Sequence, residues 1–160
     1  MNLFKHINNR ASKIALASAV VVCWFFGFAN MVQAHPEHLI VSKGSRVLTD
    51  PTGTVSIKML VEQPDVEIGE LYLAEAYGSG ALHTHGVNEY IYVTSGELGH
   101  TIDGKLHVLK PGMVGVVKPG QQVGHSVLSK GPVKALIVWV PGGEASKLLE
   151  VGFKSTPVEK

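Results

Sequence analysis

The chain has 160 residues, of which 45% are apolar and 17% charged, with 14 basic and 13 acidic side chains. The basic residues form no cluster of the kind that binds nucleic acid or an anionic membrane surface, so these partners are not expected. Cys23 is the only cysteine, which excludes a disulfide within the chain.

The first 34 residues have the pattern of a secretory signal peptide. Three basic residues and no acidic one precede an apolar run over residues 14–29, and Val32-Gln33-Ala34 follows as a small-residue end. This pattern predicts cleavage after Ala34 and a periplasmic or secreted protein. An uncleaved membrane anchor is the alternative, although the run is near the lower limit for crossing a bilayer.

Cleavage would leave about 126 residues, enough for one compact domain. It would remove three basic residues and Cys23, so the mature chain would carry 11 basic and 13 acidic side chains, a formal charge of −2. With no thiol left, cysteine-based catalysis is excluded. No membrane partner is expected after cleavage.

From residue 54 onward, short alternating segments separated by turn residues predict an all-β antiparallel sandwich or barrel. A hairpin turn is predicted at Asp103-Gly104, a short helix at Glu144–Val151 and a loose tail at Lys154–Lys160. The expected organisation is a signal peptide (1–34), an N-terminal arm (35–53), a barrel (54–141), and a helix with tail (142–160). Strands are predicted at residues 38–42, 54–61, 70–77, 97–103, 105–110, 113–118, 124–128 and 133–140.

A polar trio lies in the stretch from Gly80 to Gly96. His83, His85 and Glu89 are separated by two and four residues, so an extended chain places all three on one face. Apolar residues share that parity, as is typical of a strand that lines the interior of a barrel. Two imidazoles and a carboxylate buried together are costly unless paired, and a divalent metal is the usual solution.

The pattern HxHxxxE, followed by six residues and a Gly, resembles the first motif of the cupin superfamily. The run from Pro119 to His125 resembles the second motif. The resemblance covers roughly residues 71–140 and implies a single double-stranded β-helix, or jelly-roll barrel. It also implies one divalent transition metal, and three histidines with a carboxylate suit Fe, Mn, Ni, Cu or Zn without selecting among them. The implied ligands are His83, His85, Glu89 and His125.

Two functions from different classes follow from this resemblance. The first is an exported metalloenzyme that acts on a small oxygen-containing organic substrate, as a dioxygenase-like enzyme or as a lyase or isomerase. Glu89 would then be a catalytic proton acceptor as well as a ligand. The alternative is a non-catalytic cupin that binds a metal or a small ligand. We favour the enzyme, although the same barrel hosts many unrelated activities.

Several other side chains are given structural roles. His100 and His107, on the two strands of the predicted hairpin, are interpreted as ordinary strand residues. Tyr90 and Tyr92 have parity opposite to Glu89 and should face away from the metal. There they would suit contact with a second copy, and the resemblance makes a homodimer one expectation.

Overall fold

The computed structural model describes residues 44–158. The predicted signal peptide (1–34) and the strand predicted at His38–Ser42 lie outside these residues. Within residues 44–158, no helix is long and apolar enough to cross a membrane.

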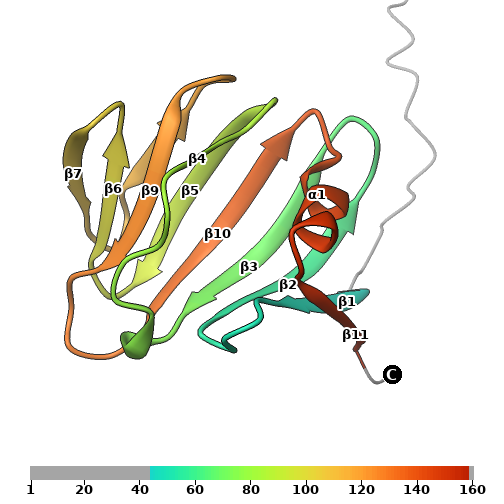
Figure 1. Ribbon diagram of the computed structural model, residues 1–160, viewed down its shortest axis with the longest axis horizontal. Helices are drawn as coiled ribbons and strands as arrows, with labels where there is room; N and C mark the ends of the chain where they lie inside the picture. Colours follow the sequence, from blue (N-terminus) through green and yellow to red (C-terminus); the bar gives the residue numbers. More distant parts are fainter. Residues whose placement is uncertain (1–43, 159–160) are drawn as a thin grey trace, which may run out of the picture. The chain divides into compact units, whose positions relative to one another are not determined.

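Two antiparallel sheets make up most of the described chain (Figure 1). The larger sheet contains, in spatial order, β11 (Lys154–Pro157), β1 (Arg46–Thr49), β2 (Val55–Glu62), β3 (Glu67–Leu73), β10 (Val133–Val140), β5 (Asn88–Ser95) and β8 (Val114–Val117). The smaller sheet contains β4 (His83–Thr84), β9 (Gln122–Val127), β6 (Leu98–Ile102) and β7 (Lys105–Leu109). A 3₁₀ helix, η1 (Glu75–Tyr77), and α1 (Glu144–Glu150) complete the set. The predicted all-β jelly roll with a short C-terminal helix is confirmed.

The core forms because alternate residues of the strands are apolar. In β3 and β10 every second side chain is buried, as the period of two for extended chain requires. The buried residues come from both sheets, so the two sheets share one core. Its members include Leu48, Ile57, Met59, Leu71, Leu73, Ile91, Val93, Leu98, Leu109, Ile137 and Trp139.

β10 is the strand that positions the site within the larger sheet. It pairs with β3 on one side and with β5 on the other. Trp139 of β10 is therefore directly opposite Glu67 on β3 and Glu89 on β5. This register brings an indole beside the carboxylate of the predicted metal motif.

The predicted hairpin between β6 and β7 is present. Asp103 and Gly104 have φ angles of 47° and 80°, the positive values that a two-residue type I′ turn needs at both positions. The register that follows places His100 opposite His107 on β7 and opposite His125 on β9.

Two local predictions are wrong. The tail predicted to be loose forms β11, which pairs with β1 along the edge of the larger sheet. All four side chains of β11 are exposed, so backbone hydrogen bonds form this strand and no apolar alternation marks it. The strand predicted at residues 70–77 starts earlier, at Glu67, and ends at Leu73, because Glu75–Tyr77 form η1.

Candidate metal centre

Strands from both sheets bring the polar side chains together. In the smaller sheet β4, β9 and β6 are neighbours and carry His83, His125 and His100 respectively. Glu89 comes from β5 of the larger sheet, and its side chain is only 1% exposed. His85 follows β4 directly and is also buried. The alternation of β5 buries Glu89 and leaves Tyr90 and Tyr92 exposed, as their parity predicts.

The four residues implied by the resemblance lie next to one another. The Nε2 atom of His85 lies 3.0 Å from Oε2 of Glu89, and Nε2 of His125 lies 3.6 Å from Oε1. The ring centroid of His83 is 4.8 Å from that of His85 and 5.5 Å from that of His125. His83 differs from the others in being exposed, and it lines the cavity described below.

Contacts behind these side chains orient them. Nδ1 of His83 lies 3.1 Å from the carbonyl oxygen of Ala81. Nδ1 of His85 lies 3.1 Å from Oε2 of Glu144. When Nδ1 donates to such an oxygen, Nε2 keeps its lone pair and can bind a metal. Trp139 Nε1 donates a 3.0 Å hydrogen bond to Oε2 of Glu89, which fixes the carboxylate and leaves Oε1 without a hydrogen bond.

The donor set fits a metal ion. Buried polar atoms without a hydrogen bond are rare in proteins, and each one costs free energy unless it has a partner. Within residues 44–158 these atoms all belong to this cluster: Oε1 of Glu89, both ring nitrogens of His100, Nε2 of His125, and Nε2 of His85, whose 3.0 Å contact with Oε2 of Glu89 is an ion pair only when the ring is protonated. A divalent cation would satisfy such imidazole nitrogens and a carboxylate oxygen together.

The electrostatics of the cluster also favour a cation. Burial alone would raise the pKa of Glu89, but contacts with His125 and His85 hold it below its usual range, so the group is a carboxylate at neutral pH. Burial alone would lower the pKa of His85, but Glu89 and Glu144 outweigh it and raise that pKa. Protonation of His85 and metal binding would therefore compete for the same nitrogen.

The interpretation of His100 as an ordinary strand residue misses its position in the cluster. Its side chain is 1% exposed, and its ring centroid lies 5.2 Å from that of His125. Burial, with a smaller contribution from His125, lowers the pKa of His100 to about 4, so the ring is neutral at pH 7. Its parity with Leu98, which is buried, is the signal in the sequence that could have identified it.

Glu144 is a second residue that the sequence did not reveal. It is the first residue of α1, is 4% exposed, and contacts His85, which lies 59 positions earlier. Its other oxygen, Oε1, accepts a 2.6 Å hydrogen bond from Lys147. A carboxylate behind a histidine is a common way to hold the ring in position for a metal. No pattern in the sequence relates a helix that follows the barrel to the first motif.

A cavity of about 230 Å³ opens beside the cluster. Its polar lining includes Tyr77, His83, His85, Glu89 and His125, and much of the rest is apolar. The C-terminal part of the chain contributes Leu148 and Phe153 to this wall. An apolar cavity with a few converging polar groups is the usual form of a small-molecule site.

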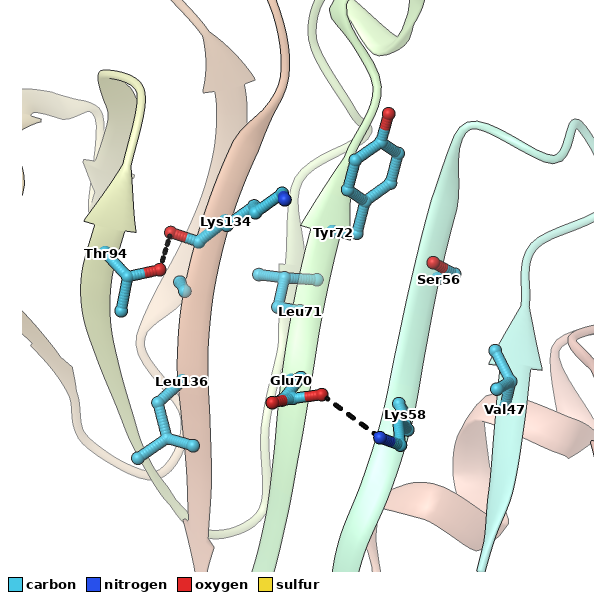
Figure 2. A pocket seen from close by; sticks show the side chains of 10 residues that line it. Val47, Ser56, Lys58, Glu70, Leu71, Tyr72, Thr94, Lys134 and Leu136 are labelled. Carbon is cyan, nitrogen blue, oxygen red and sulfur yellow. Dashed lines mark hydrogen bonds and ion pairs between the residues drawn. The ribbon is translucent and has the colours of Figure 1, made fainter. Parts of the chain in front are cut away.

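A larger depression of about 490 Å³ lies elsewhere, on the outer face of the larger sheet (Figure 2). Figure 2 shows Lys58 and Glu70 paired across it and Tyr72 farther along β3. Nζ of Lys58 lies 3.6 Å from Oε2 of Glu70. None of the clustered histidines lines this depression; three of them line the smaller cavity instead. The outer face also exposes Tyr90 and Tyr92, and the homodimer expected there stays a prediction.

The two sheets form a double-stranded β-helix, and the candidate metal centre lies between them. Residues 71–141 match the family model described as a cupin domain. This match runs from Leu71 on β3 to Pro141 just after β10, and solved structures described as RmlC-like cupins have the same fold.

Solved structures with the same fold come from several organisms. An RmlC-like cupin from Shewanella frigidimarina is 23% identical, with a TM-score of 0.53 over 62% of this chain and 86% of that one. KdgF from a Halomonas species is 18% identical, with a TM-score of 0.54 over 62% and 91%. An RmlC-like cupin from Methanocaldococcus jannaschii is 17% identical, with a TM-score of 0.51 over 59% and 86%. At these identities the likeness concerns the fold. No curated protein sequence matches significantly.

Proposed function

We propose that this chain is an exported metal-dependent enzyme that acts on a small organic substrate through an oxygen atom of that substrate. The observation that carries the proposal is the group of buried ligand atoms without hydrogen bonds at the wall of a largely apolar cavity. Residues 1–34 support export through their basic and apolar pattern.

His83, His85, Glu89 and His125 would hold the metal, as the resemblance to cupins implies. A divalent ion held by these residues would supply Lewis acidity toward an oxygen of the substrate. Dioxygenase-like chemistry and lyase or isomerase chemistry are both compatible with that role.

The cavity limits the substrate to a small molecule. At about 230 Å³ it lies below the range of about 300–1,000 Å³ that is common for ligand pockets. Burial, with a contribution from Asp50, raises the pKa of Tyr77, which keeps its phenol protonated and able to donate a hydrogen bond. We propose Glu89 as the proton acceptor as well as a ligand, a role that the resemblance to cupins implies, and its carboxylate lines the same cavity.

Metal analysis tests the centre first. We expect about one transition-metal ion per chain in protein purified from the exported fraction, and none in the His83→Ala/His125→Ala variant. His107→Ala is the matched control, because His107 is exposed and lies on β7, the edge strand of the same sheet farthest from β4. This variant should keep its metal. Stoichiometric metal in the double variant would contradict the proposed ligands.

A substrate screen separates the enzyme from the binding protein. The metal-loaded chain is incubated with flavonols, diketones and short hydroxy acids, and oxygen uptake and product formation are measured. Turnover that disappears in the double variant supports the enzyme. Tight, reversible binding of one compound without turnover across the whole screen would instead support the non-catalytic cupin.

A further inference from the structure

His100 has no partner for its polar atoms within the described chain. Its ring lies between the two sheets, and neither Nδ1 nor Nε2 makes a hydrogen bond. An imidazole that only filled space in the core would leave two polar atoms unsatisfied, at a cost that phenylalanine or leucine would avoid. A bound ligand at His100 would satisfy these polar atoms.

Two further ligand atoms converge on this ring. One atom each from Glu89, His100 and His125 lie within 4.8 Å of one another, and all three residues are buried. The oxygen of Glu89 nearest to His125 is Oε1, whereas His85 and Trp139 lie against Oε2. The two carboxylate oxygens thus have different neighbours.

The backbone opposite His100 leaves room for the ring. A Cβ atom on Gly115 of β8 would lie 2.2 Å from Nδ1 of His100 and 2.7 Å from a methyl group of Leu109. Any other residue at position 115 would displace one of them. A second cavity, of about 210 Å³, is lined by His100, Leu109, Val114 and Gly115, so His100 also borders a space distinct from the larger one beside His83.

We propose that Glu89, His100 and His125 form a second metal position, adjacent to the one that includes His83 and His85. The two positions share Glu89 and His125, so a chain holds one ion at one position or the other. Two imidazoles and one carboxylate suit zinc or another first-row divalent ion. Small side-chain movements would bring the three ligand atoms to the roughly 2.0–2.2 Å that such bonds require. This position rests on the proposed metal centre.

Zinc binding to the His83→Ala/His85→Ala variant tests the second position. That variant lacks two ligands of the first position and keeps all three of the second. We expect it to bind one zinc ion per chain by calorimetry and elemental analysis, with an affinity lower than wild type by on the order of 10-fold or more. Adding His100→Phe should abolish this binding, whereas adding His107→Phe should not.

The outcomes separate the two proposals. A wild-type chain that binds zinc while the double variant binds none would overturn only the second position. The same conclusion follows if the ion stays after His100→Phe is added. A wild-type chain that binds no divalent metal would overturn the centre and the second position together.

A measurement on unaltered His100 covers the case in which His100→Phe does not fold. In the His83→Ala/His85→Ala variant labelled with ¹⁵N, zinc should shift the ring nitrogen signals of His100 and His125 and leave those of His107 in place. Unmoved His100 signals at saturating zinc would overturn the proposal. Circular dichroism and thermal unfolding establish that each variant is folded.

Discussion

Glu89→Gln is expected to lower metal affinity by at least about 100-fold, because even changes behind a ligand cost roughly 10–100-fold. Glu89 is the carboxylate among the proposed ligands, and both proposed metal positions include it. Glutamine keeps an oxygen that can accept the hydrogen bond from Trp139, so the core should stay packed. Calorimetric titration with zinc and elemental analysis of the purified variant measure the effect.

Glu62→Gln is the matched control for this change. It also removes one negative charge, but Glu62 pairs with Arg46 on the neighbouring strand β1 and does not line the cavity. Its metal affinity should equal that of the wild type. If Glu89→Gln bound zinc as tightly as the control, Glu89 would not be a ligand.

The second large effect is expected from Glu144→Gln, which should weaken metal binding by roughly 10–100-fold. The carboxylate of Glu144 lies 3.1 Å from Nδ1 of His85. A glutamine amide accepts a hydrogen bond from Nδ1 more weakly than a carboxylate does. If the amide is flipped, its NH₂ group faces Nδ1 instead. In either case the ring of His85 is held less well, and its Nε2 becomes a poorer metal ligand. The measurement is the zinc dissociation constant at pH 7.5, together with the thermal unfolding of the metal-free chain.

Glu150→Gln, at the other end of α1, is the control, because Glu150 is exposed and on the same helix. A purely structural role for Glu144 predicts a lower unfolding temperature with unchanged zinc affinity in the folded protein. A positioning role predicts a weaker zinc affinity even where the unfolding temperature is kept. Equal affinities for Glu144→Gln and Glu150→Gln would refute the positioning role.

The sequence predicted which residues of the first motif meet, but not how they meet. The spacing of His83, His85 and Glu89 predicted one face of a single extended chain. The structure does bring the three together, but a bend at residues 86–87 separates β4 of the smaller sheet from β5 of the larger one. His125 came from the resemblance to a second motif, because strand pairing across 36 residues leaves no local pattern. The same alternation of β5 that buries Glu89 also exposed Tyr90 and Tyr92 as predicted.

The missed residues were missed for physical reasons. The parity of His100 with Leu98 pointed inward, but a lone histidine in a hairpin does not reveal that its ring lacks a partner. Glu144 depends on the docking of α1, a tertiary contact without sequence periodicity. Strand β11 was missed because it is held by backbone pairing with β1. Its four exposed side chains show no apolar alternation that would distinguish a strand from a loop.

The hydrogen bond from the Ala145 amide to Oε2 of Glu67, at 2.9 Å, ties the start of α1 to β3. Residues 71–141, which match the cupin domain, contain all four implied ligands but end before Glu144, Leu148 and Phe153. A fragment with those bounds would keep the ligands and lose both the carboxylate behind His85 and one wall of the cavity. The candidate site therefore extends beyond the matched residues, into the helix that follows the last long strand.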